Sequence, residues 1–210
     1  VCTGADLEIG WLPMLIRQSG NSSIASGPGH FMVASQVTTL EKPSQLDRAN
    51  GDVHPMGNPH IQMDPHRLLA VAKALTARLV ALDSSNAAIY QQNFTAFSTR
   101  WNAAIKRWDA KAAPLKGRKI IVQHNSWVYL NKWLGLQQIG TLESKPGVPP
   151  SSAHLAGMVK LAKTEQPFAI IRAAYQDPKA SNWLSERSGV PAIALPFTVG
   201  GDAQAKDLFG

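Results

Sequence analysis

The second half of the chain alternates short apolar segments with helical patterns. In the helical patterns, hydrophobic residues recur at three- and four-residue steps, and a capping residue or a glycine marks at least one end. The apolar segments predict strands at residues 119–123, 137–142, 168–172 and 192–195. The intervening patterns predict helices at residues 126–134, 151–163 and 177–189. Strands that alternate with helices of about ten residues predict βαβ units around a parallel sheet, and hence an α/β fold.

The first half of the chain predicts helices more clearly than strands. Residues 5–18 have a short amphipathic pattern, whereas residues 31–34 have only a weak strand pattern. Asp64 and Pro65 predict a helix start, because Asp accepts unpaired backbone N–H groups and Pro lacks an N–H that the first turn does not need. From there to Leu82 the apolar residues repeat at helical spacing, which predicts one buried face.

Residues 86–113 contain no glycine or proline and predict the longest helix of the chain. Its aromatic and aliphatic residues follow helical spacing, and Pro114 and Gly117 end the pattern. At 1.5 Å per residue the helix could reach about 40 Å, which exceeds the width of a small lobe. Two interpretations are open: one long core helix, or a rigid rod that joins two lobes.

The composition indicates a globular protein and limits its chemistry. The 210 residues are 44% hydrophobic and 17% charged, with a mean hydropathy of -0.13, which argues against a disordered chain. No apolar run approaches the ~20 residues of a membrane span, and no signal peptide is present in this sequence. Because Cys2 is the one cysteine, an internal disulfide and a cysteine-built zinc site are both excluded. Any metal chemistry therefore uses His, Asp and Glu.

The net charge of +7 raises the question of nucleic-acid binding, which needs clustered Lys and Arg. The basic residues are instead scattered, and the densest group is Lys116, Arg118 and Lys119. No zinc finger, glycine-rich RNA loop or basic heptad accompanies them. We therefore interpret the charge as a solvated surface and expect no nucleic-acid partner.

Two of the six histidines lie where a ligand would be well positioned. His60 comes shortly before the helix start at residue 64, on a loop stiffened by Pro59. His124 follows the predicted strand at residues 119–123, at the carboxyl end, where open parallel sheets bind ligands. Either residue alone could instead be an ordinary capping or hydrogen-bonding histidine. His54 has three interpretations: a ligand of the same ion, part of a metal-collecting loop, or an exposed loop residue.

Several short motifs occur in order along the chain. Asn-Pro-His at residues 58–60 precedes Asp-Pro at 64–65, and His124 precedes Tyr129 and Trp-Leu-Gly-Leu at 133–136. Four further short motifs lie at residues 5–12, 51–55, 143–151 and 196–201. In this order the motifs resemble those of the zinc- and manganese-type solute-binding proteins of ABC transporters. The resemblance spans essentially the whole chain.

The resemblance implies an α/β fold of two lobes, with parallel sheets flanked by helices, joined by one long linking helix. We expect an N-terminal lobe at residues 1–85, the linking helix at 86–115 and a C-terminal α/β lobe at 116–210. The metal ion would be captured in the cleft between the lobes.

The resemblance also implies metal ligands. Two of the family's ligand positions carry over onto His60 and His124, and His54 is a further candidate. A first ligand histidine would precede Val1, so we expect the chain to be a fragment. The family's last ligand position holds no carboxylate here, so we expect three histidines and a water, with Asp202 as the alternative fourth ligand.

The second ring nitrogen of each ligand histidine should donate to a carbonyl or carboxylate that orients the ring. Asp64 and Asn125 are near enough in sequence for this role, although Asp64 is better explained as an N-cap. Imidazole ligands suit zinc, and a site with few carboxylates is less suited to manganese. We therefore expect Zn²⁺ as the transported ligand, with Mn²⁺ as the alternative.

The function implied is that of a periplasmic or otherwise extracytoplasmic receptor, whose signal peptide is not in this sequence. It would be a monomer that delivers its ion to an ABC transporter permease in the inner membrane and catalyses no reaction. One alternative is a metal-dependent hydrolase with a His-bound zinc, although the His-Glu-x-x-His and Gly-x-Ser-x-Gly motifs are absent. Another is a receptor for a chelated metal or a vitamin.

Overall fold

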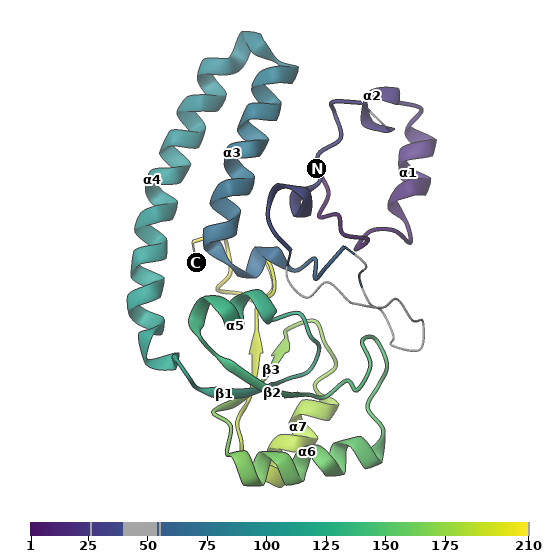
Figure 1. Ribbon diagram of the computed structural model, residues 1–210, viewed down its shortest axis with the longest axis vertical. Coiled ribbons are helices and arrows are strands. Elements are labelled where there is room, and N and C mark those ends of the chain that lie inside the picture. Colours follow the sequence, from purple (N-terminus) through teal and green to yellow (C-terminus); the bar gives the residue numbers. More distant parts are fainter. Residues whose placement is uncertain (26, 40–53, 55, 210) are drawn as a thin grey trace. The chain divides into compact units, whose positions relative to one another are not determined.

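The computed structural model describes residues 1–25, 27–39, 54 and 56–209 (Figure 1). These residues form two compact units, of which the first extends to Trp108 and the second begins at Asp109. Residues 51–53 and Pro55, which belong to one of the motifs above, lie outside the described residues. The boundaries 1–85, 86–115 and 116–210 stay a prediction.

The first unit consists mainly of helices. Its elements are α1 (Leu12–Ser19), α2 (Ser22–Ala25), η1 (Val33–Gln36), η3 (Ile61–Met63), α3 (Pro65–Leu82), η4 (Ser84–Asn86) and most of α4 (Ala87–Ala112). The helix expected from residue 5 begins only at Leu12, because Ala5 and Asp6 have φ angles of 51° and 64°, outside the right-handed helical region. The weak strand pattern at residues 31–34 yields a single parallel bridge between Cys2 and Met32, after which the chain turns into η1.

The start of α3 has the predicted capping geometry. The Oδ1 atom of Asp64 accepts a hydrogen bond from the N–H of His66 at 3.0 Å, and Pro65 occupies the first turn. Helices α3 and α4 run antiparallel to one another, joined by η4 (Figure 1). The indole N–H of Trp101 on α4 donates to the carbonyl of Pro65 at 2.8 Å, which ties the middle of α4 to the start of α3.

Helix α4 is 26 residues long and continuous, and the boundary between the two compact units falls inside it. It buries Trp101, Ala104 and Ile105 in the first unit, while its last residues belong to the second. Both earlier interpretations therefore hold in part, because one helix supplies core residues and also connects the units. None of the helices in the described ranges is long and apolar enough to cross a membrane.

The second unit is built on a parallel sheet, which confirms the predicted α/β class. Its elements are η5 (Ala113–Leu115), β1 (Lys119–Val122), α5 (Val128–Leu134), β2 (Gln137–Thr141), α6 (Ser152–Glu165), β3 (Ala169–Ala173), α7 (Lys179–Ser188) and β4 (Ala192–Leu195). The strand order is β2-β1-β3-β4, and every neighbouring pair is parallel. Each strand and helix of this unit lies where the sequence pattern predicts it, within a few residues.

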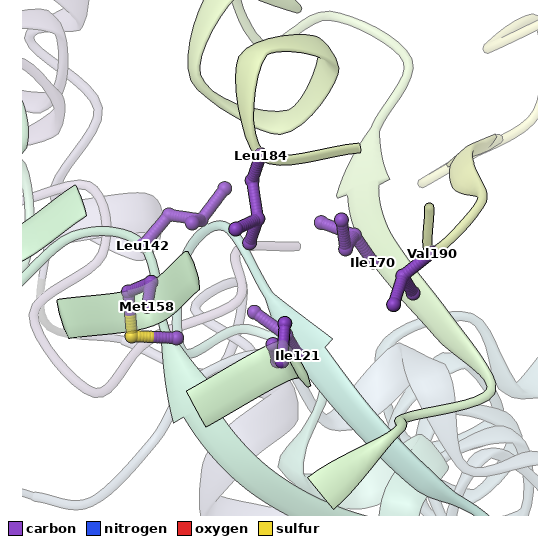
Figure 2. Close-up of a cluster of buried hydrophobic side chains, with 7 residues drawn as sticks. Ile121, Leu142, Met158, Ile170, Leu184 and Val190 are labelled. Carbon is purple, nitrogen blue, oxygen red and sulfur yellow. The ribbon is translucent and has the colours of Figure 1, made fainter. Parts of the chain in front are cut away.

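Helices α6 and α7 cover one face of this sheet, and α5 lies on its other side (Figure 1). Figure 2 shows the core between the sheet and α6 and α7, where Ile121, Ile170 and Leu142 meet Met158 and Leu184. Ile120 and Val122 point to the opposite face, because side chains alternate along a strand, and they are also buried. Burial on both faces explains why the two central strands, β1 and β3, appear in the sequence as continuous apolar runs.

Two glycines have local structural roles in this unit. A Cβ atom at Gly140 on β2 would lie 2.6 Å from the terminal methyl carbon of Met158 and 3.1 Å from a methyl carbon of Leu161, so a larger residue would force these side chains of α6 to shift. Gly135 ends α5 with a φ of 66°, a left-handed conformation that other residues rarely adopt.

We expect Ser151→Ala to lower the free energy of unfolding of the second unit by about 1 kcal/mol. The Ser151 hydroxyl accepts a hydrogen bond from the N–H of His154 at 3.2 Å and so caps the first turn of α6. Ser152→Ala is the matched control, because Ser152 is also exposed but lies inside the helix. Urea titration followed by circular dichroism compares the two variants, and equal midpoints would contradict the capping role.

Candidate metal centre

His60 lies in a buried, stiff turn directly before α3. Its side chain is only 8% exposed, and Asn58 and Pro59 beside it are buried as well. The Oδ1 atom of Asn58 accepts a hydrogen bond from the N–H of His60 at 3.1 Å, and Ile61, 1% exposed, anchors the following η3 turn. Proline restricts the backbone at residue 59. The Asn-Pro-His motif therefore forms a rigid, buried turn that fixes the backbone of His60 a few residues before α3.

His54 lies against His60 within the first unit. The centroids of the two imidazole rings are 6.3 Å apart, with the ring planes at 90°. Two imidazoles that share a tetrahedral zinc, with Zn–N bonds of about 2.0–2.1 Å, have centroids about 5–6 Å apart. The observed separation is close to that arrangement, so the fold brings together two of the three histidines singled out in the sequence.

His124 lies at the carboxyl edge of the sheet in the second unit. The backbone N–H of Gln123 donates to the carbonyl of Ile171 at 2.8 Å, which extends the β1–β3 pairing to the residue before His124. On the other side, the N–H of Glu143 donates to the carbonyl of Gln123 at 3.0 Å and so extends the β1–β2 pairing. The position of His124 is thus set by hydrogen bonds from both neighbouring strands.

The imidazole of His124 is paired with a carboxylate. Its Nδ1 atom lies 2.8 Å from Oε2 of Glu143, and both side chains are mostly buried. The same carboxylate oxygen accepts the backbone N–H of Gly147 at 2.9 Å. Because an ionised carboxylate only accepts hydrogen bonds, Nδ1 carries the proton and Nε2 is the nitrogen that can coordinate a cation.

These two side chains line a pocket of about 690 Å³ at the ends of β1, β2 and β3. Pro149, Leu155 and Trp183 give it apolar walls. Tyr175, which follows β3, also lines it, and its ring packs against that of Phe197 with centroids 5.8 Å apart. Partial burial of the phenol and then the negative charge of Glu143 raise the pKa of Tyr175 above its ordinary value, so the hydroxyl stays neutral.

Other side chains considered from the sequence have local structural roles. Asp64 caps α3 and pairs with the Nε atom of Arg67 at 3.1 Å. Asn125 accepts a hydrogen bond from the Gln138 side chain at 3.0 Å. The carboxylate of Asp202 accepts the N–H groups of residues 204 and 205 at 2.8 and 2.7 Å, and Asp202 does not line the pocket around His124. The structure thus offers no support for Asp202 as a substitute ligand.

Within the parts of the chain that the structure describes, no three His, Cys, Asp or Glu side chains gather closely enough to hold a metal ion. The first unit brings two imidazoles together, His54 and His60. The second provides the imidazole of His124 and its carboxylate partner, Glu143. Joint coordination of one ion by His60 and His124, which belong to different units, stays a prediction.

Glu143 is the residue that sequence reasoning missed. The sequence places it only within the motif segment at residues 143–151 and offers Asp64 and Asn125 as the histidine partners. A usable signal was present, because Glu143 directly follows the predicted strand at residues 137–142 and His124 directly follows the one at 119–123. Carboxyl ends of neighbouring parallel strands meet at one edge of a sheet, so residues one step beyond two such strands are expected to lie close together.

Known proteins resemble the chain along almost its whole length. A high-affinity zinc uptake system protein, ZnuA, of Bacillus subtilis is 25% identical over 203 residues, which is 94% of this chain and 62% of the relative. A metal ABC transporter substrate-binding lipoprotein, SloC, of Streptococcus mutans is 22% identical and covers 98% of this chain and 67% of its own length. The chain therefore spans about three fifths of the Bacillus protein.

Solved structures support the fold. A crystal structure of ZnuA superimposes with a TM-score of 0.72 at 23% identity, covering 93% of this chain and 70% of the other. A Zn(II)-bound AdcAII variant of Streptococcus pneumoniae gives a TM-score of 0.66 at 24% identity, covering 86% and 64%. At this level of identity the likeness establishes a common fold.

A family model, described as the periplasmic component A of the zinc-uptake complex, matches residues 1–209. This match takes in the Asn-Pro-His turn, the long helix α4 and the parallel sheet with His124 at its edge. The chain belongs to this periplasmic zinc-uptake component A family.

Proposed function

We propose that this protein captures a divalent metal ion, Zn²⁺ in preference to Mn²⁺, and passes it to the permease of an ABC transporter. His60 and His124 are the proposed ligands, with His54 as an additional ligand in the first unit. The protein would act outside the inner membrane, as a monomer, and would catalyse no reaction. Family membership and the names of the relatives support the uptake role.

The observation that carries the proposal is the hydrogen bond between His124 and Glu143 at the edge of the sheet. A metal-binding histidine typically donates its other ring N–H to a carboxylate or carbonyl, which sets the tautomer and the ring orientation. His124 has this arrangement and lines a pocket. Imidazole is a good ligand for zinc, and in the divalent series affinity for zinc is higher than affinity for manganese, so Zn²⁺ should bind more tightly than Mn²⁺.

The first unit supports the proposal with a preformed donor group. The buried Asn58–His60 hydrogen bond and the rigid Pro59 fix the backbone that carries the His60 ring, so little conformational entropy is lost when an ion binds. The ring of His54, with its centroid 6.3 Å from that of His60, adds a second imidazole.

We also propose that residues 1–85 and 116–210 act as two lobes and that residues 86–115 act as the linking helix. The single continuous α4 supports this division. A long helix is a stiffer connection than a loop, so the lobes would change their relative orientation little when the ion is released.

We expect His54→Ala to weaken Zn²⁺ binding by about tenfold, which is less than the effect of removing His60. A ligand that supplements an existing set contributes less than a ligand on a rigid, buried platform, and His54 is the more exposed of the two. Isothermal titration calorimetry with Zn²⁺ and Mn²⁺ measures both affinities. His66→Ala is the control, because His66 is exposed on α3 and alanine keeps the backbone N–H that Asp64 caps.

Absence of Zn²⁺ and Mn²⁺ binding by the unmodified protein would overturn the proposed function. Equal affinities of the unmodified protein and of His60→Ala would overturn the assignment of His60. If His54→Ala binds Zn²⁺ as tightly as the unmodified protein does, His54 is not a ligand.

A further inference from the structure

We propose that Glu143 is a positioning residue for metal capture, which holds His124 in the Nδ1–H tautomer and fixes the plane of its ring. This inference rests on the proposed function, because it assigns His124 as a ligand. In this role Glu143 does not touch the ion, but it determines how well His124 can bind the ion.

The two side chains start from backbone positions that are locked together. The N–H of Leu142 donates to the carbonyl of Val122 at 2.8 Å, and the N–H of Glu143 donates to the carbonyl of Gln123 at 3.0 Å. These bonds continue the parallel pairing of β1 and β2 beyond the last residue of each strand. Neighbouring strands lie about 4.8 Å apart, so Glu143 and His124 leave the same sheet edge side by side.

The carboxylate of Glu143 is held from a second direction as well. Gly147 donates its backbone N–H to Oε2 of Glu143 at 2.9 Å, and the intervening turn is closed by the N–H of Val148 on the carbonyl of Lys145 at 3.1 Å. Gly147 has a φ of 75°, which favours glycine at this position. The chain thus folds back so that its own backbone fixes the carboxylate before any ion is present.

One carboxylate oxygen therefore accepts from both Gly147 and His124. Charge-assisted hydrogen bonds to a carboxylate are about twice as strong as neutral ones, and the side chains of His124 and Glu143 are largely shielded from water. The imidazole must offer a proton at Nδ1, which leaves the lone pair on Nε2. The negative charge also makes the ring a better electron donor towards a cation.

Two substitutions and one control test this role. Glu143→Ala removes the acceptor, and Glu143→Gln keeps the shape but replaces the charge with an amide that can either accept or donate. Glu186→Gln is the matched control, because it removes a carboxylate from an exposed position on α7. The state of the His124 ring is measured in the metal-free protein by ¹⁵N NMR, with His124→Ala used to assign the signals, and Zn²⁺ affinity is measured by calorimetry.

In the unmodified protein and in Glu186→Gln we expect a single Nδ1–H tautomer at His124. In Glu143→Ala we expect a mixture of tautomers and a Zn²⁺ affinity lower by about 10- to 100-fold, the range found for such outer partners. In Glu143→Gln we expect a smaller loss, of about tenfold or less, and a partly mixed tautomer. If Glu143→Ala unfolds, the glutamine variant alone decides the question.

Three results would overturn the inference. One is an unchanged His124 tautomer in both variants. Another is a Zn²⁺ affinity of both Glu143 variants within about twofold of that of the unmodified protein. A third is a loss as large as that of His124→Ala in both variants, which would make Glu143 itself a ligand. Failure of the unmodified protein to bind Zn²⁺ would overturn the proposed function instead, and the NMR result would still report on the pairing.

Discussion

Replacing His124 by alanine is expected to weaken Zn²⁺ binding by about 1,000-fold, or roughly 4 kcal/mol. The substitution removes the proposed coordination bond and leaves the carboxylate of Glu143 without its imidazole partner at the pocket wall. Calorimetric titration gives the affinity, and urea titration shows whether the sheet keeps its stability. We expect little change in stability, because the hydrogen bonds that extend β1 use backbone groups that alanine retains.

The same experiment tests whether His60 and His124 bind one ion. If they do, the unmodified protein binds one Zn²⁺ at this affinity, and either single substitution removes most of the binding energy. The double substitution His60→Ala with His124→Ala should then cost much less than the sum of the single effects, because coupled ligands are not additive. Additive losses or two independent binding events would contradict a shared ion. His66→Ala remains the control for removing an exposed histidine.

Replacing Trp101 by alanine is expected to lower the free energy of unfolding of the first unit by about 3–5 kcal/mol. The side chain is 3% exposed, and its ring packs against Phe97 and Trp108 with centroids 5.3 and 5.2 Å away. The substitution also removes the hydrogen bond to the carbonyl of Pro65 at the start of α3. Since α3 begins directly after the turn that carries His60, we expect weaker Zn²⁺ binding as a secondary effect.

Chemical denaturation followed by circular dichroism measures this change, and two transitions should be fitted because the chain has two compact units. Trp101→Phe keeps one aromatic ring for packing, but it removes the indole N–H together with the five-membered part of the ring, so it should lose less stability than Trp101→Ala. Trp11→Ala is the control, since Trp11 is 51% exposed and its removal should change stability by less than about 1 kcal/mol. A Trp101→Ala variant as stable as the Trp11 variant would contradict the packing role of α4.

Local physical chemistry made most of the helices and strands predictable. The Asp64 cap, the Ser151 cap and the Gly135 terminus act through groups a few residues away, so their sequence signals carry over directly into structure. The apolar runs at residues 119–122 and 169–173 became the two central parallel strands, because burial on both faces of a sheet demands continuous apolar segments. The pattern failed at residues 5–11, where the positive φ angles of Ala5 and Asp6 interrupt an otherwise amphipathic segment.

The candidate site was predictable only in part. His60 and His124 stand out because each follows or precedes a recognisable element boundary and belongs to a motif of the family. The sequence identified the histidines but not their partners. The approach of His54 to His60, and the pairing of His124 with Glu143, depend on contacts across 6 and 19 positions of the chain. Such contacts follow from strand order and from the shape of turns, which single-residue patterns do not encode.

By itself, the sequence determined the α/β class, the uninterrupted long helix and the two histidines that family motifs single out, because periodicity, capping and chain stiffness are local properties. The tertiary structure decided which groups surround those histidines. The order β2-β1-β3-β4 sets Glu143 beside His124, and the Gly147 turn directs the carboxylate onto Nδ1. Hydrogen bonds between segments distant in the chain form only when the backbone has folded. The pairing of His124 with Glu143 therefore depends on the tertiary structure.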